Sequence, residues 1–101
     1  MVGHRHYVVS GRVQGVGFRA FAEKRGQALG LVGRVRNLRD GRVEIVARGE
    51  LSTLAAFEAQ IAKGPLLSRV DEVKTVELDS PLRIFDGLNE FVRENDGDET
   101  W

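Results

Sequence analysis

The sequence predicts an α+β fold of the ferredoxin-like type, a split βαβ sandwich with two helices on one face of an antiparallel sheet. Two observations carry this prediction. The chain has 101 residues, 42% of them hydrophobic, which suits one small domain with a single core. Its hydrophobic pattern switches between a period of two and a helical period in the order β-α-β-β-α-β. The strand order expected for such a sheet is 4-1-3-2.

The first strand and the first helix meet at a glycine-containing loop. Tyr7, Val9 and Val13 alternate with polar residues, which predicts a strand over HYVVSGRV. The period then changes, because the apolar residues from Phe18 onward recur at helical spacing. Gly30 supplies a helix stop signal, so a helix is expected between Phe18 and Gly30.

A hairpin, a second helix and a fourth strand follow. LVGRVRN and RVEIVARG predict two strands joined by a tight turn at LRDG. Ser52 is expected to cap a helix that stops at Gly64-Pro65 and turns three apolar residues inward, Leu54, Phe57 and Ile61. VDEVKTVEL predicts the fourth strand, and Phe91–Arg93 is consistent with a short final strand.

We expect a single domain over residues 1–93, followed by a frayed acidic tail at 94–101. The sequence contains no run of about eighteen apolar residues and no apolar N-terminal run of signal-peptide length. It contains no cysteine, which is compatible with a reducing compartment. The expected protein is therefore a soluble, cytoplasmic monomer with no membrane partner.

Charge is distributed unevenly along the chain. Residues 1–50 contain ten Lys or Arg and four Asp or Glu, whereas residues 51–101 contain five and eleven. An anionic ligand is therefore expected to be drawn to the first half. Arg34, Arg36 and Arg42 either widen that positive field or form the solvated face of the hairpin. The formal net charge of zero argues against a nucleic-acid partner.

The stretch GRVQGVGFR, residues 11–19, joins the first strand to the first helix. Gly15 to Ala20 match the G-x-G-x-x-A pattern of dinucleotide-binding folds, but a hairpin follows in place of further βα units. No Gly-Lys-Ser/Thr follows either, so this is not a Walker loop. What remains is the property that these loops share, a row of backbone N–H groups at a helix N-terminus that attracts anions. A tight strand-to-helix turn is the simpler alternative.

Arg19 favours the anion site over the simple turn. A cation in the first turn of a helix opposes the helix dipole, so another interaction should favour it there. A guanidinium beside a row of N–H donors matches a phosphoryl group, which it can bind through two oxygens. An ion pair with Glu23, four residues later, is the alternative. Asn37 ends the second strand, and the topology brings it to the same edge of the sheet as residues 14–19.

Two motifs in the chain resemble those of the acylphosphatases. The first, Gly-x-Val-Gln-Gly-Val-x-Phe-Arg, stands at Gly11–Arg19 without departure. The second is Gly-aromatic-apolar-basic-Asn followed by Gly-x-Val and Gly, and it stands at Gly33–Asn37, Gly41–Val43 and Gly49. Arg34 replaces the aromatic residue, and Leu38 stands where some members have threonine. The resemblance covers the chain from about Tyr7 to Val76.

The resemblance implies an acylphosphatase, which hydrolyses the carboxyl–phosphate anhydride to a carboxylate and inorganic phosphate without metal or cofactor. It implies that Arg19 and the backbone amides of the loop bind the phosphoryl group and that Asn37 orients the attacking water. The implied phosphate-binding loop consists of Gln14, Gly15, Val16, Gly17, Phe18 and Arg19. A carboxylate leaving group with a pKa of about 4 needs no general acid. Inorganic phosphate and sulfate are expected to compete with the substrate.

Three alternatives compete with this interpretation. RNA-recognition modules share the fold but carry aromatic residues on the third strand, and RVEIVARG has none. A regulatory or carrier domain is the second alternative, including the acylphosphatase-like domain of the carbamoyltransferases that mature hydrogenases, which would act on carbamoyl phosphate. Long further segments follow that domain, whereas this chain ends at Trp101, so a free-standing enzyme is expected. His4 and His6 share one strand face, but two such residues without a third ligand are more often solvent-facing, so no metal site is expected.

Overall fold

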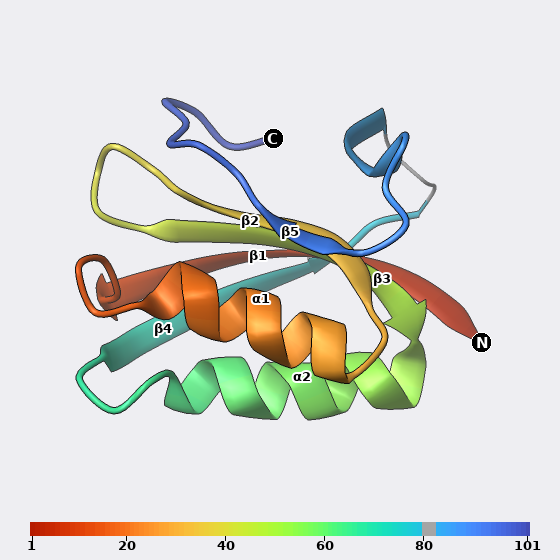
Figure 1. The fold of residues 1–101 in the computed structure, drawn as a ribbon, viewed down its shortest axis with the longest axis horizontal. Coiled ribbons are helices and arrows are strands. Elements are labelled where there is room, and N and C mark those ends of the chain that lie inside the picture. Colours follow the sequence, from red (N-terminus) through yellow and green to blue (C-terminus); the bar gives the residue numbers. More distant parts are fainter. Residues whose placement is uncertain (80–82) are drawn as a thin grey trace.

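The computed structural model describes residues 1–79 and 83–101 and contains one sheet with two helices on one face (Figure 1). In chain order the elements are β1 (Val2–Arg12), α1 (Phe18–Ala28), β2 (Val32–Asn37), β3 (Val43–Glu50), α2 (Leu51–Lys63), β4 (Arg69–Glu77), a 3₁₀ turn (Arg83–Phe85) and β5 (Phe91–Arg93). The sheet order is β4-β1-β3-β2-β5. The predicted ferredoxin-like fold and the 4-1-3-2 order are therefore confirmed, and β5 pairs in parallel with β2 at the far edge.

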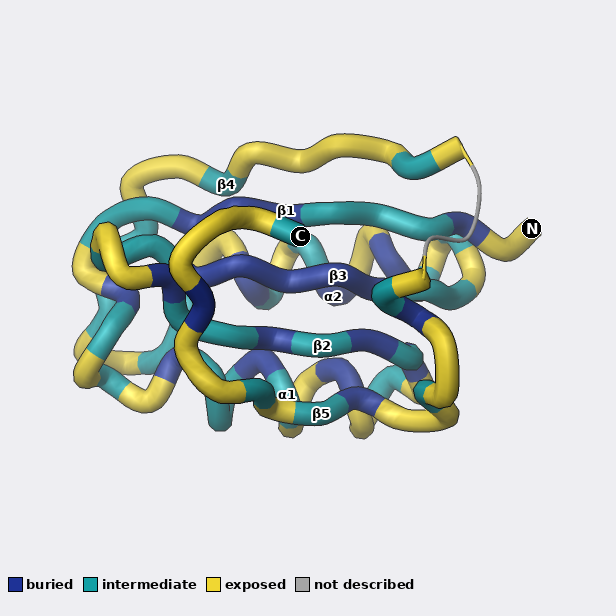
Figure 2. The backbone as a smooth tube through the Cα atoms, turned by 90° about the horizontal axis from the view of Figure 1, so that it is seen from above, coloured by how far each residue is buried: buried dark blue, intermediate teal, exposed yellow. Residues whose placement is uncertain are grey.

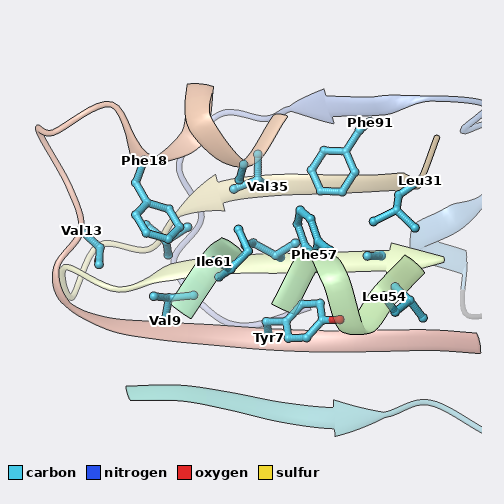
Figure 3. Close-up of a cluster of buried hydrophobic side chains, with 14 residues drawn as sticks. Tyr7, Val9, Val13, Phe18, Leu31, Val35, Leu54, Phe57, Ile61 and Phe91 are labelled. Atoms are coloured by element: carbon cyan, nitrogen blue, oxygen red, sulfur yellow. The ribbon is translucent and has the colours of Figure 1, made fainter. Parts of the chain in front are cut away.

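The core lies between the sheet and the helices (Figure 3). α1 contributes Phe18 and Ala22, α2 contributes Leu54, Phe57 and Ile61, and the strands contribute mainly Tyr7, Val9, Val35, Val43, Ile45 and Phe91. Phe91 fixes the short β5, because its ring packs against that of Phe57 with 5.5 Å between centroids. A Cβ atom at Gly26 of α1 or Gly33 of β2 would overlap the Phe91 ring. Glycine at these two positions therefore lets α1 and β2 pack closely against the Phe91 ring.

Both helices begin without a side-chain cap. α2 starts at Leu51, directly after Glu50 in extended conformation, so the prediction that Ser52 caps this helix was wrong. The reason is that β3 runs into α2 with no intervening loop, and the Leu51 N–H donates to the Met1 carbonyl at 2.9 Å. The predicted stop at Gly64 is confirmed, with a φ of 69°. Within residues 1–79 and 83–101, no helix is long and apolar enough to cross a membrane.

β4 forms one edge of the sheet and pairs only with β1. All nine of its residues are exposed or half-buried. Several of them are charged, including Asp71, Glu72, Lys74 and Glu77. The opposite edge differs, because there the short β5 covers β2.

Residues 94–101, which we call the C-terminal strap, cross the face of the sheet that the helices leave open (Figures 1 and 2). The Glu94 N–H donates to the Val35 carbonyl at 2.8 Å, and the Gly97 N–H donates to the Asn37 carbonyl at 2.9 Å. This placement differs from the frayed tail that the sequence predicts. The difference has a physical reason, because the acidic side chains of the strap meet arginines of α1 and of the β2–β3 hairpin.

Candidate functional site

A cavity of about 150 Å³ lies where α1 begins and β2 ends. It is lined by Val13, Gln14, Gly15, Gly17, Phe18, Arg19, Ala20, Asn37 and Arg93. The structure thus brings Arg19, Asn37 and most of the predicted loop to one cavity. Val16 is the exception, because its side chain packs against the hydrophobic core and does not line the cavity.

The loop owes its shape to two glycines. Gly15 and Gly17 have φ angles of 73° and 79°, in the left-handed region that other residues rarely adopt. A Cβ atom at either position would meet nothing within 4 Å, so glycine is needed for the backbone conformation and not for lack of space. Gly17 immediately precedes α1, whose N-terminus has no side-chain cap. The first-turn N–H groups of α1 therefore begin at the cavity wall, where such groups attract anions.

Gln14 ties this loop to the β2–β3 turn. Its side-chain Nε2 donates to the Leu38 carbonyl at 2.6 Å and to the Arg42 carbonyl at 2.9 Å. Both hydrogens of the amide group are therefore used, which leaves its oxygen and the backbone for other contacts. This crosslink holds the loop at a fixed distance from Asn37, which immediately precedes Leu38.

Arg19 lies in the first turn of α1, and its side chain is 36% exposed. Its Nη1 donates to the Glu94 carbonyl at 3.1 Å and lies 3.6 Å from a carboxylate oxygen of Asp96. The alternative of an ion pair with Glu23 was wrong, because Glu23 pairs with Arg93 at 3.1 Å. The guanidinium of Arg19 therefore contacts the strap, and the residue also lines the cavity.

Asn37 is the last residue of β2 and pairs with Val43 of β3. Its carbonyl accepts the hydrogen bond from Gly97, and the residue lines the cavity together with the loop. Leu38, which follows it, is 1% exposed. The leucine that stands here in place of the threonine of some family members is therefore a buried residue.

Sequence reasoning missed Arg93 as a cavity residue. It is on β5, which lies beside β2 with Arg93 opposite Val35. The only signal was the short FVR run, which is typical of a strand but says nothing of the strand's neighbour. Glu94 and Asp96 were missed for the same reason, since they follow Arg93 in a stretch that the sequence predicts to be frayed.

The three hairpin arginines that were considered as a source of positive field do not line the cavity, and all three form ion pairs. Arg34 pairs with Glu94 at 3.3 Å, Arg36 with Glu44 at 2.9 Å and Arg42 with Asp40 at 2.8 Å. Of these acidic partners, Glu94 comes from the acidic second half of the sequence, whereas Glu44 and Asp40 belong to the first half. These arginines do not form an open positive field around the site.

Glu44 forms a buried cluster on the strap side of the sheet. Its side chain is fully buried and accepts from His6 Nε2 at 2.6 Å, Arg36 Nε at 2.9 Å and the Trp101 N–H at 2.7 Å. Burial alone would raise the pKa of Glu44, but these hydrogen bonds and the charge of Arg36 outweigh it and lower the pKa. A charged carboxylate is thus held beneath the strap.

The two histidines that were considered as metal ligands have other neighbours. His6 is bonded to Glu44, and His4 packs edge-on against the ring of Phe85 at 5.3 Å between centroids. Burial and the nearby charge of Arg48 lower the pKa of His4. In the part of the chain that the structure describes, no group of three or more His, Cys, Asp or Glu residues could hold a metal ion.

The fold and the cavity define a class of protein, a ferredoxin-like domain whose glycine-containing loop at the start of a helix lines a cavity together with an arginine and an asparagine. The sequence model described as Acylphosphatase matches residues 5–91. The chain therefore belongs to the acylphosphatase family, as the two motifs predict.

Individual relatives agree with this assignment. An acylphosphatase of Koribacter versatilis is 53% identical over 70 residues, which cover 69% of this chain and 64%, just under two thirds, of that protein. One from Thermus thermophilus is 52% identical over 67 residues, which cover 66% of this chain and 76% of that protein. The crystal structure of the Bacillus subtilis acylphosphatase superposes with a TM-score of 0.81 at 36% identity, covering 90% of this chain and 96% of that one. Acyl-phosphate hydrolysis is thus the activity of this enzyme.

Proposed function

We propose that the chain hydrolyses acyl phosphates with Arg19, the loop of residues 14–19 and Asn37 as its working parts. The observation that carries this proposal is the shared cavity, which Arg19, most of the loop and Asn37 line together. A cavity of about 150 Å³ suits a phosphoryl group with its attacking water, leaving the acyl group toward the solvent.

The phosphoryl group would be held by fixed positive charge and by backbone donors. The N–H groups at the start of α1 would bind its oxygens with the favourable helix dipole behind them. Arg19 would contribute a guanidinium that binds two oxygens in a planar fork and keeps its charge at all relevant pH values. These contacts stabilise the charge that the phosphoryl oxygens carry in the transition state.

Asn37 would orient the attacking water. The new bond forms between the water oxygen and phosphorus, while the bond between phosphorus and the acyl oxygen breaks in line with it. The acyl group leaves as a carboxylate, whose pKa of about 4 makes a general acid unnecessary. Asn37 does not act as a base near neutral pH, so the water proton passes to a phosphoryl oxygen and appears on inorganic phosphate. No step needs a metal ion.

The test is hydrolysis of benzoyl phosphate and carbamoyl phosphate in ¹⁸O-labelled water, with a chelator present. Attack at phosphorus places the label in inorganic phosphate, and attack at the carbonyl carbon places it in benzoate. We expect label in phosphate for the wild type and at least about a hundredfold slower turnover for Arg19→Ala and for Asn37→Ala. Label in benzoate, or wild-type turnover by either variant, would contradict the proposed roles.

We further propose that the enzyme works as a cytoplasmic monomer and that inorganic phosphate and sulfate occupy its anion site. The absence of cysteine is compatible with a reducing compartment. Light scattering across a range of protein concentrations tests the monomer, because a mass that rises with concentration would contradict it.

A further inference from the structure

We propose that the C-terminal strap, residues 94–101, is a positioning element that holds Arg19 and Asn37 in a fixed relation to each other. The proposal rests on the roles proposed above for these two residues. The whole strap lies outside residues 5–91, the part of the chain that the family's sequence model matches.

The strap holds Arg19 by one edge of its guanidinium. The Glu94 carbonyl and the Asp96 carboxylate both lie against Nη1, at 3.1 and 3.6 Å. Among the residues that the structure describes, no partner is found for Nε or Nη2 of Arg19. A backbone carbonyl fixes the guanidinium without cancelling its charge, so the two remaining nitrogens are left as a fork for two phosphoryl oxygens.

The same segment holds the backbone on either side of Leu38. The Gly97 N–H donates to the Asn37 carbonyl at 2.9 Å, and the Gly97 carbonyl accepts from the Arg39 N–H at 3.1 Å. These two bonds form a parallel bridge between Leu38 and Gly97. Glu94, which contacts Arg19, and Gly97, which contacts Asn37, are thus only three positions apart, so a short piece of backbone links these two cavity residues.

The far end of the strap is anchored on the buried Glu44. The Trp101 N–H donates to Glu44, and the guanidinium of Arg36 lies 4.1 Å from the centre of the Trp101 ring while its Nε donates to the same carboxylate. Along the strap, Glu94 pairs with Arg34 and Asp98 pairs with Arg39. Arg34 is the residue that replaces the aromatic of the second motif, so this departure supplies a partner for the strap.

A purely stabilising role for the strap makes a different prediction from a positioning role. If the strap only covered the sheet, its loss would lower the melting temperature and leave the turnover of the folded fraction unchanged. If it positions Arg19 and Asn37, turnover per folded molecule falls even well below the melting temperature, because small displacements of positioning groups cost large factors in rate.

The main experiment is a chain that ends at Arg93, assayed on benzoyl phosphate alone and in the Arg19→Ala and Asn37→Ala backgrounds. We expect truncation to lower kcat/KM on the order of tenfold or more in the wild-type background. In each variant background the loss should be at least about threefold smaller, because one of the two positioned groups is already missing. Equal losses in all three backgrounds would overturn the proposal.

Gly97→Ala tests the same idea in the full chain, should the truncated chain not fold. A Cβ atom at position 97 would lie 2.4 Å from Nη1 of Arg36, whose guanidinium is pinned by Glu44 and Trp101. We expect this variant to lose kcat/KM about threefold to tenfold while its circular dichroism stays native. Asn95→Ala, an exposed strap residue, is the matched control and should keep wild-type turnover.

The outcomes separate this proposal from the proposed function. If Arg19→Ala and Asn37→Ala lose activity but Gly97→Ala and the folded truncated chain do not, the strap is not a positioning element and the roles of the two residues stand. If Arg19→Ala or Asn37→Ala keeps wild-type turnover, the roles themselves are wrong, whatever the strap variants do.

Discussion

Glu23 and Arg93 form an ion pair with 3.1 Å between Oε1 and Nε, and this pair joins α1 to β5 beside the cavity. Because the carboxylate of Glu23 is paired with Arg93, it does not neutralise Arg19, which lies one turn earlier on the same helix. The charge of Arg19 is opposed mainly by Asp96, whose side chain is 63% exposed and therefore well screened by water. The positive charge of Arg19 is thus available to bind an anion in the cavity.

Replacement of Arg19 should weaken both binding and turnover. Arg19→Ala removes the fixed charge from the phosphoryl group, so kcat/KM should fall by an amount equivalent to about 3–5 kcal/mol. The affinity for inorganic phosphate should fall as well. Steady-state kinetics and calorimetry measure the two effects. Lys24→Ala removes an exposed cation from the same helix and is the control. Normal phosphate binding by Arg19→Ala would show that the anion site lies elsewhere.

Asn37→Ala should lower turnover without changing the affinity for inorganic phosphate. The variant removes only the group that orients water, so kcat should fall by roughly a hundredfold or more. The loop and Arg19 remain, and phosphate should therefore bind with near wild-type affinity in calorimetry. Folding should barely change, because Asn37 is half-buried at the edge of the cavity. A wild-type kcat would refute the assigned role.

Inorganic phosphate and sulfate should inhibit competitively. Both anions fit the row of N–H groups at the start of α1 beside Arg19, which is where the substrate's phosphoryl group is expected. Initial rates at several substrate and phosphate concentrations should give lines that share one maximal velocity. Purely noncompetitive inhibition, or no inhibition at millimolar phosphate, would place anion binding outside the substrate site.

Activity should survive a chelator and stay broadly flat between about pH 5 and 7.5. Neither guanidinium nor carboxamide titrates in this range, and the leaving carboxylate needs no proton. The measurement is a pH profile of kcat/KM with and without chelator. If the chelator abolishes turnover and zinc restores it, a metal takes part and the mechanism must be revised, with His4 and His6 as the first ligands to examine.

Glu44→Gln should remove part of the acid sensitivity of folding. The pKa of Glu44 is lowered in the folded state, where its carboxylate faces His6, Arg36 and the Trp101 amide. The charged carboxylate therefore stabilises the fold at pH values above the ordinary glutamate pKa of about 4.3. This contribution is lost as the pH falls below that value and through the pKa in the folded state. The wild-type melting temperature should therefore fall more steeply than that of Glu44→Gln between about pH 5 and 3.

At neutral pH the same variant should be less stable by about 3–5 kcal/mol, because it leaves the guanidinium of Arg36 with a weakened partner. Glu72→Gln, on the exposed edge strand, is the control and should follow the wild type at every pH. If the melting temperatures of Glu44→Gln and the wild type fell in parallel as the pH is lowered, Glu44 would not be the source of this acid sensitivity.

The features that the sequence predicts correctly depend on local pattern. The strands show a period of two, α1 and α2 show a helical period, and their hydrophobic residues form the core. The sequence also indicates that the loop of residues 14–19 and Asn37 lie close together, because each stands in a contiguous motif and the topology brings the two to one edge of the sheet. Their presence in one cavity follows from the crossover between β1 and β2.

The features that the sequence does not predict depend on contacts between distant segments. Arg19 and Glu94 are 75 positions apart, and no local pattern announces a bond between a side chain and a remote carbonyl. Glu44 alternates with Val43 and Ile45, which is the pattern of a solvent-facing residue, but the strap covers it. Ser52 was misplaced as a cap because the direct passage of β3 into α2 removed the loop that a cap would follow.

The edge strand β4 also bears on how the enzyme behaves at high concentration. Its outer backbone groups are unpaired within the sheet, and a strand of nine residues is long enough to template the addition of another chain. Asp71, Glu72, Lys74 and Glu77 counter this, because an incoming strand would have to strip water from their charges. Protection against edge-to-edge aggregation thus falls on β4 side chains, whereas at the other edge the terminal strand β5 is only three residues long and offers a much shorter template.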